Sequence, residues 1–183
     1  YGGSCFPKDV TALISTAKTL KYNSKLLKSV NEVNDYQKLC LDRKISKFFN
    51  NKLNNKRIAV WGLSFKPNTD DVRYAPSTST ISSLLKKGAN IKAYDPVASL
   101  KKDLNNFKGK YIEKDNAITV LKDADALVIF TEWKEFWSID LNIFLTHMAS
   151  PVIFDGRNIY SPERMAKNNI LYFGVGRGSS KLS

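Results

Sequence analysis

The spacing of apolar residues divides the chain into two parts near residue 56. In the first part, apolar residues recur three or four positions apart, which is the period of an amphipathic helix. Leu13, Ala17 and Leu20 begin this pattern, and Leu26 and Val30 resume it after a break at residues 23–24. Since neither Gly nor Pro interrupts residues 9–49, the pattern predicts a long helical element with one break.

A helix of this length exceeds what a small domain covers with its own core. We therefore expect it to pack against another subunit or another domain, with residues 26–49 forming a two-fold interface to a second copy of the chain and so a homodimer. The alternative is two ordinary helices that fold back on the domain. The turn-rich, polar segment 50–56 predicts a boundary, with one unit over residues 1–55 and another over residues 56–183.

Beyond the boundary, short apolar runs alternate with helical patterns, which predicts an α/β fold with a doubly wound, mostly parallel sheet after the long helix. The run at residues 126–130 is continuously apolar, as a strand buried on both faces requires. The expected strands cover residues 57–61, 90–94, 110–112, 126–130, 151–154 and 170–173. The expected helices cover residues 77–87, 98–106, 116–122, 139–147 and 162–167.

Four loops with polar or charged residues follow predicted strands: residues 62–73, Asp95, residues 131–133 and residues 155–157. In open parallel sheets, ligands bind at the carboxyl ends of the strands, so these loops predict a nucleotide cleft. Residues 62–64 do not form a Gly-x-Gly-x-x-Gly fingerprint, which argues against a complete dinucleotide site here.

Three cations in these loops are candidate phosphate ligands. Lys66 and Arg73 can meet phosphate oxygens, and Arg157 can do so in a bidentate way. The alternative is that Lys66 and Arg73 pair with Asp70 and Asp71 as surface charges. Trp133, Phe136 and Trp137 are candidates for stacking on a base or for simple loop packing.

The first nine residues combine Gly2 and Gly3 with a cysteine, a proline and the Lys8-Asp9 pair. Glycines let the backbone approach a ligand closely. A thiol near a lysine and a helix start ionises more readily, and the thiolate is the nucleophile. We expect Asp9 to cap the helix. A tight turn with a buried, inert Cys5 is the alternative from residue types alone.

Three segments together resemble one protein family. Residues 1–9 resemble the catalytic-cysteine segment of the UDP-glucose dehydrogenase family of nucleotide-sugar dehydrogenases. Residues 62–73 resemble its nucleotide-binding turn, and residues 154–158 its late arginine segment. The segments follow the family order and span most of the chain. The resemblance implies a Rossmann-like UDP-binding domain, a UDP-sugar substrate and NAD as cofactor.

The resemblance also assigns roles to individual residues. It implies that Cys5 is the nucleophile and that Asp9 helps to activate water. It implies that residues 5–8, Lys8 included, and Arg73 contact the cofactor. The implied substrate contacts are Gly2, Gly3, Phe65, Lys66 and Arg157. Tyr74 stands where many relatives carry an acidic residue, which leaves the role of that position open.

The implied chemistry is oxidation of a primary alcohol to an acid by two hydride transfers. A cysteine holds the substrate as a thiohemiacetal and then as a thioester, while the cofactor carries the hydride. The family also needs a cofactor domain, a glutamate and a lysine–asparagine pair upstream of the cysteine. These are not in this sequence, so we expect a fragment that is inactive alone and lacks an N-terminal NAD-binding domain.

The sequence Ser4-Cys5-Phe6 resembles UDP-glucose dehydrogenases more than relatives that carry Gly-His-Cys at this place. A GDP-mannose or other nucleotide-sugar dehydrogenase is the near alternative. The net charge of +12 suits an anionic partner. A basic nucleic-acid-binding module without enzyme activity is therefore the rival, although the motifs favour a nucleotide sugar and no nucleic acid.

The sequence contains no apolar run long enough to span a membrane, so we expect no membrane partner. Two separated cysteines do not make a disulfide framework, which favours the reducing cytoplasm. The single histidine, His147, has no metal-ligand spacing to a cysteine or an acid, so no metal site is expected.

Overall fold

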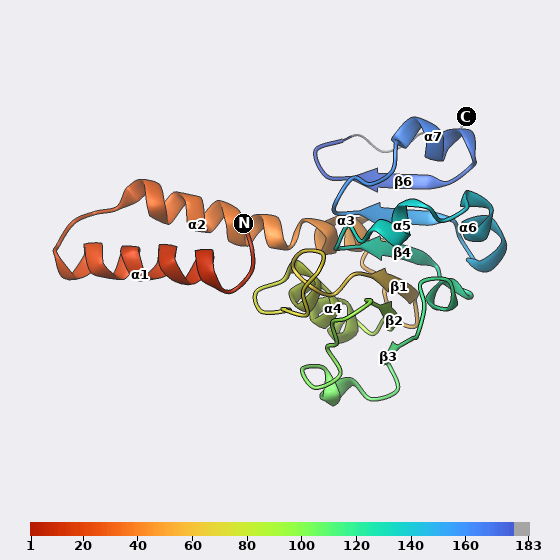
Figure 1. Cartoon of the computed structure of the whole chain (residues 1–183), viewed down its shortest axis with the longest axis horizontal. Coiled ribbons are helices and arrows are strands. Elements are labelled where there is room, and N and C mark those ends of the chain that lie inside the picture. Colours follow the sequence, from red (N-terminus) through yellow and green to blue (C-terminus); the bar gives the residue numbers. More distant parts are fainter. Residues whose placement is uncertain (178–183) are drawn as a thin grey trace.

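The computed structural model describes residues 1–177, and two helices project from an α/β domain as a hairpin (Figure 1). Helix α1 spans Cys5–Thr19 and helix α2 spans Lys25–Lys38. The predicted single helical element is therefore wrong in one respect, since the break at residues 20–24 reverses the chain. The end of α1 explains the reversal. Lys21 adopts φ 54°, the amide of Tyr22 donates to the carbonyl of Ala17 at 2.8 Å, and the chain leaves the helix through a Schellman turn.

A second break separates α2 from helix α3, which spans Cys40–Phe48. The two helices follow one another closely, with Leu39 (φ −96°, ψ 11°) between them. Helix α3 lies against the sheet, where Leu41 and Ile45 are 5% and 0% exposed. The expectation that residues 26–49 form one interface is therefore wrong for the part after Leu39, because this part belongs to the core of the α/β domain.

Six strands form one sheet within residues 1–177, in the order β3-β2-β1-β4-β5-β6, and all neighbours are parallel. This confirms the predicted fold class. The strands are β1 Arg57–Trp61, β2 Asn90–Tyr94, β3 Tyr111–Glu113, β4 Ala126–Ile129, β5 Val152–Asp155 and β6 Leu171–Gly174. The helices between them are α4 Pro76–Lys86, α5 Lys134–Trp137, α6 Leu141–His147 and α7 Pro162–Lys167.

Strand β1 shows how one apolar run supplies two cores. Ile58 and Val60 join the core beneath α3 and α4, whereas Ala59 and Trp61 join the core beneath α5, α6 and α7. Alternate residues of a strand point to opposite faces, so a fully buried strand has to be apolar throughout. Both faces of the sheet are therefore covered, as a doubly wound fold requires.

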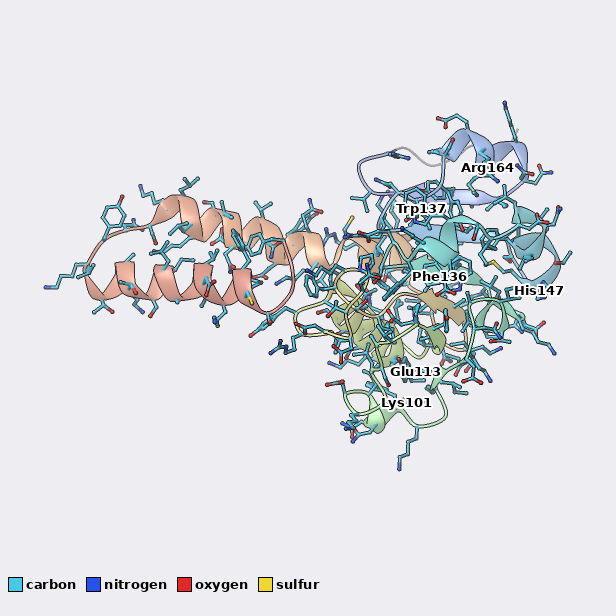
Figure 2. All side chains as sticks on the ribbon, viewed as in Figure 1. Lys101, Glu113, Phe136, Trp137, His147 and Arg164 are labelled. Atoms are coloured by element: carbon cyan, nitrogen blue, oxygen red, sulfur yellow. The ribbon has the colours of Figure 1, made fainter. Side chains whose placement is uncertain are left out.

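Two predicted helices are reduced to single 3₁₀ turns, Asn105–Phe107 and Thr119–Leu121. In the first case Glu113, labelled in Figure 2, fastens the preceding loop instead. Its carboxylate accepts hydrogen bonds from the amide of Leu100 at 2.7 Å and from the hydroxyl of Ser99 at 2.8 Å. In the second, the carboxamide oxygen of Asn116 accepts the amides of Ile118 and Thr119, which closes a turn rather than starting a longer helix.

No helix among residues 1–177 is both long and apolar enough to cross a bilayer. The same residues contain no group of three or more His, Cys, Asp or Glu side chains placed to hold a metal ion. The division into units at residue 56 stays a prediction, and its second unit ends in residues 178–183, which lie outside the described part.

Candidate nucleotide-sugar site

The loop after β1 is held close to the loop after β4. Gly62 has φ 83°, and a Cβ at this position would lie 2.5 Å from the Cβ of Thr131. The hydroxyl of Thr131 donates to the carbonyl of Ser64 at 2.5 Å. Only glycine fits both the left-handed backbone and this approach. Two loops of the predicted cleft, those after β1 and β4, are therefore joined directly.

Asp95, which follows β2, organises the same edge of the sheet. Its Oδ2 accepts hydrogen bonds from the amide of Leu63 at 2.7 Å and from the indole Nε1 of Trp133 at 3.1 Å. The amide and hydroxyl of Ser64 donate to the same oxygen, both at 3.2 Å. Asp95 thus connects three of the predicted loops, and its Oδ2 is occupied by hydrogen bonds from the protein itself.

The three aromatic side chains considered for base stacking have different environments. Phe136, labelled in Figure 2, is fully buried. It stacks on Trp61 with ring centroids 4.8 Å apart. Trp133 is bound to Asp95 and packs on the core. Trp137 alone is exposed. Loop packing is therefore the role of Phe136 and Trp133.

The cysteine segment packs against the loop after β1. Gly3 is buried with φ 76°, and a Cβ there would lie 2.9 Å from the ring of Phe65. The hydroxyl of Ser4 donates to Asp71 at 3.3 Å. Gly2 is half-buried beside the backbone of Tyr74. Residues that are more than sixty positions apart are thus brought together, including Gly3 and Phe65 of the predicted substrate contacts.

Cys5 is the first residue of α1 and is exposed, so the alternative of a buried cysteine is wrong. Asp9 does not cap the helix, because α1 starts four residues earlier and includes the buried Pro7 in its first turn. Asp9 instead lies one turn beyond Cys5, on the same side of the helix. The ammonium of the exposed Lys8 lies 3.7 Å from the Oδ1 atom of Asp9.

Arg73 pairs with Asp71, which is the surface-charge alternative that we considered. Its Nε and Nη2 donate to the two carboxylate oxygens at 2.9 and 3.0 Å. Hydrogen bonds from Arg73 lower the pKa of Asp71 to about 2. The hydrogen bond and charge of Asp71 raise the pKa of Arg73, and Cys5 adds a smaller contribution. Arg73 keeps 70% of its side chain exposed.

Lys66 and Tyr74 have fewer contacts. The Lys66 ammonium lies 5.2 Å from the centre of the Phe65 ring and forms no ion pair in the described part of the chain. Tyr74 adopts φ 56° and is 60% exposed, with the Lys38 ammonium 6.0 Å from its ring. Lys66 is thus free to meet an anion, and the role of Tyr74 stays open.

Arg157 follows β5, where the buried Asp155 fixes the backbone. Asp155 accepts hydrogen bonds from the amides of Arg157 and Ile159, both at 2.8 Å, and from the hydroxyl of Tyr172 at 2.9 Å. Burial, and then the charge of Asp155, raise the pKa of Tyr172. The Arg157 side chain donates from Nε and Nη2 to Glu132, a partner that the sequence analysis did not identify. No hydrogen bond or ion pair within residues 1–177 joins Arg157 to the cysteine segment.

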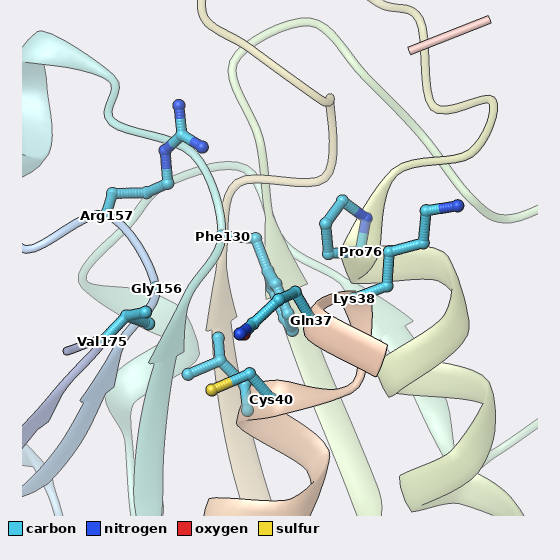
Figure 3. Close-up of a pocket in the computed structure, with 9 residues that line it drawn as sticks. Gln37, Lys38, Cys40, Pro76, Phe130, Gly156, Arg157 and Val175 are labelled. Atoms are coloured by element: carbon cyan, nitrogen blue, oxygen red, sulfur yellow. The ribbon is translucent and has the colours of Figure 1, made fainter. Parts of the chain in front are cut away.

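A cavity of about 310 Å³ opens at this edge of the sheet, between the α2–α3 junction and the ends of β4, β5 and β6 (Figure 3). Cys40 is half-buried and lines this cavity. Gly156 lies opposite, where a Cβ would lie 2.9 Å from Leu41. The other lining residues are Gln37, Lys38, Pro76, Phe130, Arg157 and Val175.

Comparison with known proteins identifies the relationship. The family model described as "UDP-glucose/GDP-mannose dehydrogenase family, UDP binding domain" matches residues 59–162, and that of the central domain of the same family matches residues 1–36. This chain belongs to the UDP-glucose/GDP-mannose dehydrogenase family. The predicted resemblance is confirmed.

Individual relatives agree with this assignment. The UDP-glucose 6-dehydrogenase of Pseudomonas aeruginosa is 40% identical, with 97% of this chain and 40% of the relative covered. The enzyme TuaD of Bacillus subtilis is 39% identical, with 97% and 38% covered. A UDP-glucose dehydrogenase structure from Pyrobaculum islandicum superposes with a TM-score of 0.79 at 27% identity, covering 97% of this chain and 38% of that one. The chain thus spans about 40% of the length of the curated relatives it matches.

Proposed function

We propose that this chain supplies the catalytic-cysteine segment and the UDP-sugar-binding domain of an NAD-dependent UDP-glucose dehydrogenase, which oxidises UDP-glucose to UDP-glucuronate. The observation that carries the proposal is the packing of Gly3 on the Phe65 ring, with Cys5 exposed beside it. This contact joins a nucleophile to the strand-end loops that suit a nucleotide diphosphate. Lys66 and Arg157 supply the positive charge, while Gly2 and Gly3 leave room for the hexose.

Cys5 acts as the nucleophile in the second half of the reaction. Its thiolate adds to the aldehyde carbon of the half-oxidised sugar, and the carbonyl oxygen takes a proton, which gives a thiohemiacetal. Loss of hydride from that carbon and of the hydroxyl proton gives a thioester. Water directed by Asp9, one turn further along α1, then cleaves the carbon–sulfur bond and releases the acid and the thiol.

The residues present fit the edge of a dinucleotide site. Lys8 and Arg73 are exposed cations, and Cys5 contributes to the electrostatics of Arg73. Bound NAD would accept the two hydrides. The residues of this chain would hold only its nicotinamide end and part of its phosphates, because residues 62–64 are not a dinucleotide fingerprint. An N-terminal NAD-binding domain is therefore required, and this chain alone is expected to be inactive.

Calorimetry with UDP tests the nucleotide site directly. The chain should bind UDP in preference to GDP and should not bind NAD with comparable affinity. Lys66→Ala should weaken UDP binding by roughly 1.5–3 kcal/mol, the scale of a charge-assisted hydrogen bond. Lys101→Ala is the matched control, because Lys101 pairs with Glu113 beside β3. Tighter binding of GDP would favour the GDP-mannose alternative, and salt-dependent binding of generic DNA without UDP binding would favour the nucleic-acid rival.

The covalent role of Cys5 is tested in the full-length enzyme, where Cys5→Ser should stall turnover. In the present chain, iodoacetamide should modify the exposed Cys5 faster than the half-buried Cys40. A fully active Cys5→Ser enzyme would rule out the thioester route. Both thiols are free in the structure, which fits the proposed location in a reducing cytoplasm.

We also propose that α2 forms the homodimer contact. Leu26, Val30 and Val33 on this helix are 76%, 40% and 60% exposed. Burying such residues contributes roughly 25 cal/mol per Å² of apolar surface, which favours association. Sedimentation should show a dimer at micromolar concentration and a shift toward monomer for Val33→Asp. A stable wild-type monomer would contradict the dimer.

A further inference from the structure

The contact between Glu132 and Arg157 crosses from the loop after β4 to the loop after β5. Arg157 Nη2 donates to Glu132 Oε1 at 2.6 Å, and Nε donates to Oε2 of the same carboxylate. The side chains of Arg157 and Glu132 are 37% and 30% exposed, so solvent reaches both. Burial opposes ionisation of Glu132, but the hydrogen bonds from Arg157 prevail and its pKa is lowered. The carboxylate is therefore charged at neutral pH.

Glu132 is fixed by its two neighbours in sequence. Thr131 is fully buried and donates to the carbonyl of Ser64, while Trp133 donates to Asp95. The side chains on either side of Glu132 are thus anchored to the loops after β1 and β2. A carboxylate on so rigid a segment can orient a long side chain rather than follow it.

Arg157 also stands on a rigid backbone, but its side chain is long and rotatable. Its amide is tied to the buried Asp155, but its guanidinium lies four bonds further out at the rim of the cavity. Figure 3 shows this group directed away from Gly156 and Cys40. A guanidinium has five N–H donors. Two of them serve Glu132, so three remain for another acceptor.

We propose that Glu132 is a positioning residue that holds the Arg157 guanidinium so that its three remaining N–H groups meet the diphosphate of the nucleotide sugar. This role rests on the proposed function, since it assigns the anion to that site. Without Glu132, the arginine would have to lose its rotational freedom when the ligand binds, and that entropic cost would weaken binding.

The sign of one substitution separates positioning from competition. Glu132 carries a negative charge close to the proposed anion. If it merely competed for Arg157, removing that charge would strengthen binding of the diphosphate. If it positions Arg157, removing the charge weakens binding despite the more favourable electrostatics.

The experiment is calorimetry of UDP binding to the wild-type chain and to Glu132→Gln. We expect the variant to bind about tenfold more weakly. Glu135→Gln is the matched control, because it removes the same charge at a position three residues further along the chain. The Glu135 carboxylate accepts a hydrogen bond from the hydroxyl of Tyr94 and not from Arg157. This control should bind UDP as tightly as the wild type or slightly more tightly. Equal or tighter binding by Glu132→Gln would overturn the role.

A double-mutant cycle tests whether the effect passes through Arg157. In an Arg157→Ala background, Glu132→Gln should change UDP affinity less than twofold, because no guanidinium is left to orient. A tenfold loss in that background as well would show a general structural effect and overturn the proposal. Glu132→Asp, which keeps the charge on a shorter side chain, should recover part of the lost affinity.

A measurement without ligand separates the failure of this inference from failure of the proposed function. The Arg157 Nε–H resonance, assigned with Arg157→Lys, should be protected from solvent exchange in the wild type and lose that protection in Glu132→Gln. Absence of protection in the wild type overturns the positioning role alone. A wild-type chain that shows the protected resonance and binds no UDP overturns the proposed function, and with it the role assigned to Glu132.

Discussion

The helical hairpin α1–α2 and the α/β domain differ in how they bury apolar surface. Helix α1 buries only Pro7 and helix α2 only Asn34, although both carry many apolar residues. In the α/β domain, β1, β4 and β5 are buried along nearly their whole length. The domain therefore contains its own core, whereas many apolar residues of the hairpin stay exposed in the single chain.

Helix α3 marks the change between these regions. It continues the direction of α2 but packs as part of the domain, since Ile45 is fully buried. Asp42 accepts two hydrogen bonds at 2.9 Å from Lys87, the residue that follows α4, and Lys87 also donates to Ser46. Apolar residues with the same helical spacing are thus exposed before Leu39 and buried after it. Spacing identifies the face of a helix, but not what covers that face.

The largest expected contrast is in stability. Ile45→Ala should lower the free energy of unfolding of the α/β domain by about 2–5 kcal/mol, because it leaves a cavity in a closed core. Leu13→Ala on α1, which is 54% exposed and lies outside the proposed α2 dimer contact, should change it by less than about 0.5 kcal/mol. Urea unfolding followed by tryptophan fluorescence reports on the domain through the buried Trp61. Equal effects of the two variants would contradict the division between the regions.

The contact that docks the hairpin on the domain is tested at Gly3. Gly3→Ala introduces a Cβ at 2.9 Å from Phe65 on a left-handed backbone, so it should cost more than about 1–2 kcal/mol and loosen the cysteine segment. Gly109→Ala is the matched control, since it has a similar φ of 81° and no atom within 4 Å of the added Cβ. Hydrogen exchange in residues 1–9 should rise only in the Gly3 variant. Unchanged exchange there would show that the Phe65 contact does not hold the segment.

Lys21→Gly should make the hairpin more stable, by up to about 1 kcal/mol. Lys21 occupies the left-handed position that glycine adopts without strain, and this gain exceeds the loss from a more flexible unfolded chain. Slower amide exchange at the C-terminal end of α1 would report the gain. Faster exchange would show that the lysine side chain contributes more than the strain costs.

The smallest effect is expected from the acid titration of Asp71, which links the two regions through Ser4. Its pKa is about 2 in the folded chain, against 3.8 for the unperturbed group. Its contribution to stability is therefore present above about pH 3.8 and is lost as the pH falls toward 2. Asp71→Asn should remove this pH dependence, seen as a smaller change in thermal midpoint between pH 4 and 2. An identical acid response in both proteins would contradict the assignment.

Local patterns predicted much of the domain because each strand is short, apolar and followed by a turn. The boundary helices were less predictable. The turn at Lys21 lacks the glycine that normally signals a Schellman motif. Residues 116–122 have a helical pattern, but the Asn116 side chain accepts backbone amides and closes a turn in place of a longer helix. The partner of Arg157 was also missed, although Glu132 stands in a strand-end loop that the topology places beside it.

The sequence by itself determined the family, the α/β class and the residue types of the site, because motifs and hydrophobic periodicity are local properties of the chain. Only the tertiary structure decided which charges pair and which stay free. Arg73 meets Asp71 and Arg157 meets Glu132, whereas Lys66 lies over the Phe65 ring and forms no ion pair within residues 1–177. Ion pairing depends on distances of a few ångströms between segments far apart in sequence, and those distances exist only once the strands have taken their order in the sheet.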